Sequence, residues 1–434
     1  KNRGVVMNKK IIIIVILSIV TGLVILNIIN KENTIINETT EIEKNKNMLT
    51  MMLETEAGTG NYEEVTQSEW PQDGYVFNAS LSRCENGGTL SWDDDAKKVI
   101  VQTNASDKCY IYFDIYNPTL AELCAGKTLS NCIKENIYTE DGANGLYYHD
   151  GIGTYTNASE EAGDNSYRYA GADPNNYVCF GSDEVSCADN NLYRIIGLFD
   201  DNKDGTYNIK LIKYDYATSD ILGISGAYSQ KYYYDTSFYK GNINIDYIGT
   251  YLWGEGRRPS YWELSSLNTI NLNTTYWDNL GIKWQNLIIT TTWNVSESYD
   301  LTALSVQNSY QNEIINSVET KIYEDEIGLM YVSDYGYAAS PENWIIILSN
   351  YDNDINRNNN WLYMGLYEWT ITPVSSLEAG AFGIYNLNYD GGISFILDTG
   401  GGLQPVAVRP CFYLNSDVTY VSGTGTQSDP FRIA

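Results

Sequence analysis

The feature that most constrains this chain is an uncharged apolar run at residues 11–29, IIIIVILSIVTGLVILNII. A helix of about 20 apolar residues is long enough to cross the hydrocarbon core of a bilayer. The run therefore predicts a transmembrane anchor within residues 1–30. Basic residues precede the run and place the N-terminal stub in the cytoplasm by the positive-inside rule; they are Lys1, Arg3, Lys9 and Lys10. The sequence predicts a single-pass membrane protein whose C-terminal part is extracellular.

A cleaved signal peptide is the main alternative to an anchor. Signal peptides have an apolar region of about 7–15 residues followed by a small-x-small cleavage site. The run here is longer, and the polar segment that follows it, NKENTIINETTEIEKNKN, contains no such site. We therefore favour the uncleaved anchor, and both interpretations predict export.

Composition narrows the classes of function. The chain has 27 Lys and Arg against 55 Asp and Glu, a formal net charge of −28. Such a surface repels the phosphates of nucleic acids and anionic lipid headgroups, so we expect no nucleic-acid partner. The only histidine is His149, which removes most serine–histidine and cysteine–histidine catalytic sets and multi-histidine zinc sites from consideration. We predict no catalytic residues and favour a protein that binds without catalysing a reaction.

The cysteines predict disulfides, which exported proteins form readily. Six of the seven cysteines fall into pairs that are close in sequence. Because six cysteines allow 15 pairings, the local pairing is a prediction from proximity: Cys84 with Cys109, Cys124 with Cys132, and Cys179 with Cys187. Cys411 remains, in the apolar segment AVRPCFYL, and we expect a buried, unreactive thiol there.

The pattern along the chain predicts an α+β protein with several parts. Residues 31–59 are polar until NMLTMMLE and suggest a stalk or short amphipathic helix. Residues 60–116 alternate in short runs and predict a small antiparallel β module stapled by a disulfide. Residues 117–166 predict a linker with a helix, in which Thr119 and Glu122 form a capping box. Residues 167–434 predict a larger domain with short strands and long loops.

An ordered series of motifs, including NSYRYAG, NYVCFGS and AVRPCFYLNSDVTYVSGTGTQSDPFRI, resembles a large set of exported surface proteins of gut Firmicutes. Upstream, NMLTMMLETEAGTGNYEEV and SDKCYIYFD are similar to the N-terminal module of that set. The closing Val-Arg-Pro segment is in turn similar to the last strand of formylglycine-generating-enzyme-like domains. That resemblance implies a C-type-lectin-like fold for residues 167–434, without the redox cysteine pair of those enzymes.

One segment is a partial match to a calcium-binding loop. Asp200, Asn202 and Asp204 place oxygen ligands at alternate positions before Gly205. The twelfth position is Leu211 instead of a bidentate glutamate, and the segment lies between two strand-like runs. A hairpin turn is therefore the favoured interpretation, with calcium as the alternative.

The segment 361–405 alternates aromatic residues with Gly, Asn and Ser, and in lectin-like folds the ligand face lies shortly before the closing strand. Loops on a rigid scaffold concentrate binding residues, and aromatic side chains are frequent at such contacts. The predicted ligand-binding residues are Tyr363, Tyr367, Phe382, Tyr385, Asn386, Asn388, Tyr389 and Asp390. Trp361 and Trp369 are expected in the core.

Acidic residues in and near this segment offer an enzymatic alternative. Two carboxylates held at the required separation hydrolyse glycosides, and the candidates are Asp334, Glu368, Glu378 and Asp390. Because acids are abundant in this chain, we favour surface charge for them. Arg409 is expected to anchor the closing strand by pairing with a buried acid or with carbonyl groups.

Together these patterns predict a cell-surface adhesion protein that recognises a glycan or protein ligand on another cell or host surface. A surface glycan hydrolase and a self-assembling structural wall protein are the two alternatives.

Overall fold

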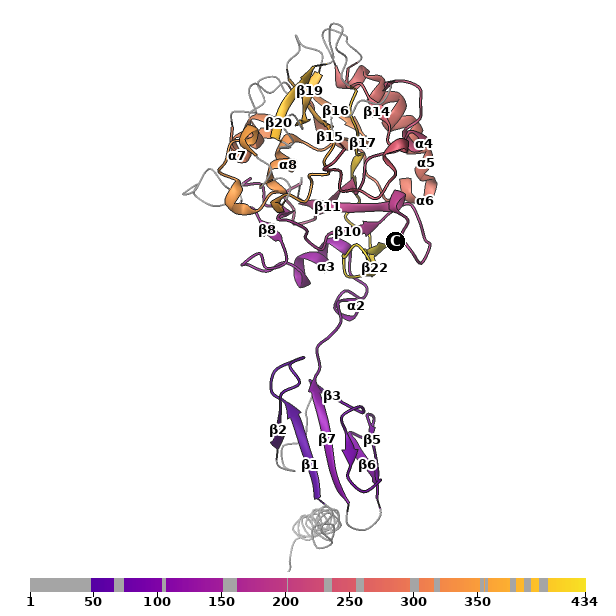
Figure 1. The fold of residues 1–434 in the computed structure, drawn as a ribbon, viewed down its shortest axis with the longest axis vertical. Helices are drawn as coiled ribbons and strands as arrows, with labels where there is room; N and C mark the ends of the chain where they lie inside the picture. The colour runs from indigo at the N-terminus through magenta and orange to yellow at the C-terminus, as the bar shows by residue number, and fades with distance from the viewer. Residues whose placement is uncertain are drawn as a thin grey trace, which may run out of the picture. The chain divides into compact units, whose positions relative to one another are not determined.

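The computed structural model describes residues 48–65, 74–103, 107–150, 162–200, 202–229, 236–254, 261–296, 304–315, 321–351, 355, 358–374, 380–385, 392–397 and 405–434. The chain divides into two compact units, Lys1–Pro118 and Thr119–Ala434 (Figure 1). The predicted anchor at residues 11–29 lies outside the described residues. Within the described ranges, every helix is too short or too polar to pass through a bilayer.

The first unit is built from strands. They are β1 (Met48–Glu54), β2 (Tyr62–Val65), β3 (Tyr75–Phe77), β4 (Arg83–Cys84), β5 (Thr89–Asp93), β6 (Lys98–Gln102) and β7 (Lys108–Ile115). The order β2-β1-β7-β3 forms one sheet, with β4 also paired to β7, and β5 and β6 form a separate hairpin. The β1–β7 pair is parallel, whereas the other pairs of this unit are antiparallel. This sheet is therefore mixed because of β1, which precedes the predicted module, whereas the described pairs within residues 60–116 are antiparallel as predicted.

Residues 31–47 of the segment expected to be a stalk or helix lie outside the described residues, and residues 48–54 of it form strand β1. Its Met and Leu residues have good helix propensity, but β1 pairs with β2 on one side and with β7 on the other. Met51 of β1 is buried against Ile111 and Phe113 of β7 in the core of this unit. Pairing and burial override local propensity here, so the helix prediction was wrong.

All three predicted disulfides are present, Cys84–Cys109, Cys124–Cys132 and Cys179–Cys187. The first joins the neighbouring strands β4 and β7. The core of the first unit is small, and a cross-link compensates for limited burial in a module of this size.

The main sheet of the second unit has the order β17-β21-β12-β11-β9-β8, with β10 also paired to β11. Its strands are β8 (Leu146–Tyr148), β9 (Tyr167–Tyr169), β10 (Tyr177–Cys179), β11 (Leu192–Phe199), β12 (Asn208–Lys213), β17 (Ile327–Gly328) and β21 (Cys411–Leu414). β11 and β12 pair as an antiparallel hairpin. Both are buried along nearly their whole length, which makes them the centre of the core.

Shorter elements surround this sheet. The remaining strands are β13 (Tyr228–Ser229), β14 (Thr250–Tyr251), β15 (Thr291–Asn294), β16 (Ile322–Asp325), β18 (Glu368–Pro373), β19 (Gly380–Tyr385), β20 (Gly392–Leu397), β22 (Tyr420–Ser422) and β23 (Arg432–Ile433). The α-helices are α2 (Leu120–Leu123), α3 (Leu129–Asn136), α4 (Ser219–Leu222), α5 (Trp277–Leu280), α6 (Ile282–Gln285), α7 (Val306–Tyr310) and α8 (Val332–Tyr337). Two π-helical segments are η4 (Leu267–Tyr276) and η6 (Gln311–Ile315). The short 3₁₀ turns are η1 (Asp189–Asn191), η2 (Ile245–Tyr247), η3 (Trp262–Leu264), η7 (Pro341–Asn343) and η8 (Leu348–Asn350). The described chain is thus α+β, mostly strands with few helices.

The segment predicted as a linker packs within the second unit from residue 119 onward. Thr119 and Glu122 form the expected capping box at the start of α2. Helix α3 then buries Leu129, Cys132 and Ile133 in the core cluster of this unit. Its burial makes α3 part of the domain.

Arg409 anchors the start of the closing strand as predicted. Its guanidinium donates from Nε to Oε1 of Glu368 at 2.7 Å and from Nη2 to Oε2 at 2.9 Å. Nη2 also donates to the carbonyl oxygen of Leu362 at 2.6 Å. Two residues later, Cys411 is buried, and burial raises the pKa of its thiol to about 12, so the prediction of a buried, unreactive cysteine is confirmed.

Candidate functional site

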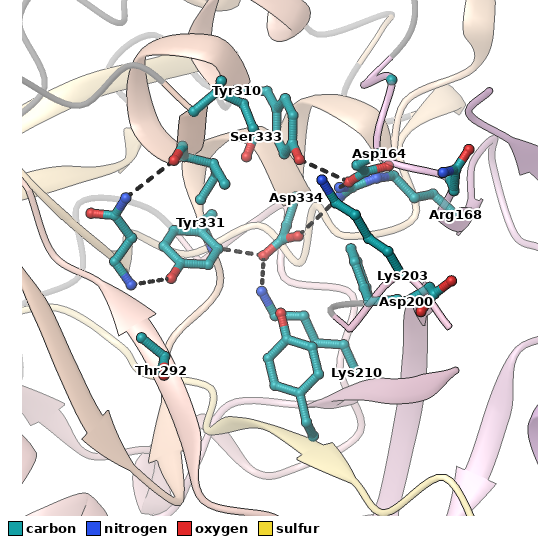
Figure 2. Close-up of a pocket in the computed structure, with 17 residues that line it drawn as sticks. Asp164, Arg168, Asp200, Lys203, Lys210, Thr292, Tyr310, Tyr331, Ser333 and Asp334 are labelled. Atoms are coloured by element: carbon teal, nitrogen blue, oxygen red, sulfur yellow. Dashed lines mark hydrogen bonds and ion pairs between the residues drawn. The ribbon is translucent and has the colours of Figure 1, made fainter. Parts of the chain in front are cut away.

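The second unit contains a cavity of about 510 Å³ (Figure 2). The turn between β11 and β12 contributes to its lining, as do β9, β12, β15, α7, η6, the start of α8 and β21. The residues that carry the argument are Asp164, Arg168, Phe199, Asp200, Lys203, Lys210, Thr292, Tyr310, Tyr331, Asp334 and Tyr413. They are spread over some 250 positions of sequence, and the sheet brings them together.

Lys210 and Asp334 form a buried ion pair in the cavity wall. Lys210 Nζ lies 2.6 Å from Asp334 Oδ2, and both side chains are almost fully buried. The lysine also lies over the rings of Tyr331, at 4.4 Å from the ring centroid, and Tyr413, at 5.2 Å. Burial lowers the pKa of Lys210, but the adjacent Asp334 carboxylate outweighs it and the pKa is raised. The ammonium therefore stays charged inside the fold.

Asp334 owes its position to the start of helix α8. Its Oδ2 also accepts the backbone N–H of Tyr331 at 2.8 Å, which closes a capping box. The buried Glu313 accepts the backbone N–H groups of Val332 at 2.9 Å and Ser333 at 3.0 Å. Two carboxylates thus satisfy the first amides of one helix, where negative charge is favourable.

Arg168 links Asp334 to a second carboxylate. Its Nη2 donates to Asp164 Oδ2 at 2.6 Å, and its Nη1 lies 3.5 Å from Asp334 Oδ1. The guanidinium carbon lies over the rings of Phe199, at 4.6 Å, and Tyr310, at 5.3 Å. Burial lowers the pKa of Arg168, but Asp164 and other neighbours outweigh that effect and the pKa is raised. The guanidinium is a permanent charge in this wall.

Asp164 is held as a carboxylate. Burial alone would raise its pKa, but the Arg168 guanidinium and further polar contacts lower the pKa to about 2. Tyr310 also donates its hydroxyl to Asp164 Oδ2 at 3.0 Å. A general acid in glycoside hydrolysis needs a raised pKa, so Asp164 is unsuited to that role.

The predicted calcium loop forms the turn between β11 and β12. Asp200 Oδ1 accepts the N–H of Asp204 at 3.0 Å, and Oδ2 accepts the N–H of Gly205 at 2.9 Å. Asp204 Oδ1 accepts the N–H of Thr206 at 2.9 Å. Among the described residues, Asp200, Asn202 and Asp204 are not part of a compact group of metal-binding side chains. Their geometry is that of the hairpin turn that the sequence favoured.

The predicted ligand face at 361–405 is described only in part. Tyr363 and Tyr367 are 0 % and 2 % exposed, so both side chains are packed in the core; that either contacts a ligand stays a prediction. Trp361 and Trp369 are buried as expected. Phe382 and Tyr385 are on strand β19, but their side chains lie outside the described residues. The other candidates lie wholly outside the described residues; they are Asn386, Asn388, Tyr389 and Asp390.

The acids proposed for hydrolysis are also placed differently from the expectation. Glu368 and Asp334 are buried and paired with cations, so neither is surface charge. Glu378 and Asp390 lie outside the described residues. The contacts of Asp334 within the ion-pair network give it a structural role.

The sequence did contain a signal for this cavity. Lys210 interrupts the apolar strand NIKLIK, and Arg168 sits within YRY next to small and apolar residues. A charge inside a buried strand must be paired, so both residues indicated a network of buried charges. Asp164 lies only four positions before Arg168, but Asp334 lies 124 positions after Lys210, so that partner could not be read from sequence.

The second unit is thus an α+β domain with a cavity whose wall combines aromatic rings and paired charges. Cavities with few polar groups set among aromatic side chains are typical of ligand-binding sites. No protein-family model, curated protein or solved structure matches this chain.

Proposed function

We propose that this chain is a cell-surface binding protein that recognises a glycan or protein ligand on another cell or host surface. Residues 11–29 anchor it in the membrane, and the part of the chain that follows them is extracellular. The three disulfides support an exported location, because such bonds persist in oxidising compartments. The strongly acidic composition favours solubility and disfavours nucleic acid as a partner.

The cavity is the observation that carries this proposal. Its volume of about 510 Å³ lies within the range of roughly 300–1,000 Å³ that is typical of small-ligand sites. Rings of Phe199, Tyr310, Tyr331 and Tyr413 line it together with paired charges. Aromatic faces provide rigid contact area for the apolar faces of sugars, and the polar groups fix orientation.

We propose a C-type-lectin-like fold for the second unit because its sequence motifs follow one another in the order found in that fold. Tyr363 and Tyr367, two of the ligand contacts that those motifs implied, are in the core. We therefore assign recognition to the cavity and keep the segment 385–390 as the competing surface.

Binding of the full chain to an array of glycans and host surface proteins tests the proposal. Thr292 is exposed on β15 and lines the cavity, so Thr292→Trp should fill it and abolish binding without changing the melting temperature. Thr89→Trp is the matched control, since Thr89 is an exposed strand threonine in the first unit. Loss of binding in Tyr385→Ala/Asn388→Ala/Tyr389→Ala, with Thr292→Trp unaffected, would transfer the site to the segment 385–390.

A further inference from the structure

The carboxylates in the cavity wall have little hydrogen-bonding capacity left for a ligand. Asp164 Oδ1 accepts both the N–H and the hydroxyl of Ser166. Asp164 Oδ2 accepts from Arg168 and Tyr310. Each of these oxygens already has two donors, and a carboxylate oxygen has two acceptor positions. Asp164 therefore offers nothing further to a ligand that brings donors.

Asp334 and Asp200 are engaged less completely than Asp164. Asp334 Oδ2 accepts from Lys210 and from the N–H of Tyr331, and Oδ1 faces Arg168. The oxygens of Asp200 accept the N–H groups of Asp204 and Gly205 in the hairpin turn. By this count one acceptor position remains on Asp334 Oδ1 and one on each oxygen of Asp200, and the other acceptor positions of these carboxylates are used within the fold.

The cations retain unused donors. An ammonium has three N–H bonds and a guanidinium has five. Within the described part of the chain, Lys210 Nζ donates one hydrogen bond, to Asp334, and Arg168 donates three. Lys203 lines the cavity from the exposed turn and forms no hydrogen bond or ion pair through Nζ with any described residue. Figure 2 shows these three cations in the same cavity as Asp334.

We propose that this cavity binds the carboxylate of an acidic saccharide, such as a hexuronic acid residue. This deepens the proposed function and rests on it. The charged groups of the wall have more unused donors than unused acceptor positions, which favours a ligand that brings acceptors, and a carboxylate is the acceptor that Lys and Arg bind most strongly. Arg168 and Lys210 provide donors inside the cavity, and Lys203 provides a charge at its exposed turn.

Two further features favour a sugar as the carrier of that carboxylate. Phe199, Tyr331 and Tyr413 provide ring surface beside the cations, which suits the alternating apolar and polar faces of a pyranose. The chain as a whole carries a net charge of −28, which disfavours nonspecific capture of polyanions. Binding of an acidic ligand therefore depends on the local donors and is sensitive to their loss.

The test compares uronic-acid oligosaccharides with their carboxyl-reduced counterparts on the full chain. We expect the acidic members to bind at least about tenfold more tightly than the reduced ones, the effect of one charge-assisted hydrogen bond. Lys203→Met should remove about the same factor, and Lys203→Arg should retain binding. Lys283→Met is the matched control, because Lys283 is an exposed lysine paired with Asp183 outside this cavity.

Four results would overturn the inference. Equal binding of acidic and carboxyl-reduced saccharides would show that the cavity does not recognise the carboxylate, and it would leave the proposed function in place. An equal effect of Lys283→Met and Lys203→Met would show a general charge effect. Peptides with a free C-terminal carboxylate binding in place of saccharides would identify a different carrier. Absence of binding to every glycan and host protein on the arrays would overturn the inference and the proposed function together.

Discussion

Replacing Arg409 by methionine removes the cation that holds the closing strand. Arg409 and Glu368 are both about 1 % exposed and are joined by two short hydrogen bonds. Methionine retains much of the side-chain volume but leaves the Glu368 carboxylate buried without its cation. Breaking one side of a buried pair costs about 3–5 kcal/mol. For a unit of this length we expect the melting temperature to fall by roughly 5–10 °C.

Calorimetry of the full chain measures this change, and we expect two compact units to unfold in two transitions, of which the second unit's should shift. Glu368→Met/Arg409→Met removes both charges, and we expect it to lose less stability than Arg409→Met alone. Burial already raises the pKa of Glu368, and Arg409 opposes that effect. Without Arg409 the pKa of the Glu368 carboxyl is raised further, so this group is more readily neutral at pH 4. The variant therefore loses less stability at pH 4 than at pH 7.

The double variant also provides the refutation. If Arg409→Met lowered stability by less than about 1 kcal/mol, the pair would not hold the strand. If the double variant lost the sum of both single effects, the two residues would act independently. Either result would contradict the role assigned to this ion pair.

Two further predictions concern stability. Asp164→Asn should lower the free energy of unfolding by about 2 kcal/mol at neutral pH, because the folded pKa of about 2 lies below the ordinary value of 3.8. The stabilisation is complete above about pH 4 and is lost as pH falls through about 2. The free energies of unfolding of the variant and the unchanged protein, measured by acid unfolding, should therefore converge at low pH. Removing the Cys84–Cys109 bond by Cys84→Ala/Cys109→Ala should destabilise the first unit by about 3 kcal/mol, given a separation of 25 residues. An unchanged calorimetric transition of the first unit would contradict a stabilising role for this disulfide.

Local features of the fold were predictable from sequence because their causes are local. The capping box needs only Thr119 and Glu122, four positions of chain. The turn that begins at Asp200 joins two apolar runs that can only pair as neighbours. The disulfides follow from proximity along the chain, and Arg409 in an apolar segment required a buried acceptor.

Features that depend on distant partners were not predictable. Strand β1 has helix-favouring residues, and its true state is set by β7, which begins at Lys108. Tyr363 and Tyr367 have the composition of a recognition loop, yet the packing of the second unit buries them. The cavity needs Arg168, Lys210 and Asp334 from three separate elements, and only the tertiary fold brings them together.

Hydrogen–deuterium exchange on the full chain, with and without a saccharide that the array identifies, tests the central claim most directly. The cavity site predicts slower exchange on binding in the turn at 202–206 and at the start of α8, around Tyr331 and Asp334. Protection confined to residues 385–390, with these two segments unchanged, would contradict the assignment of recognition to the cavity.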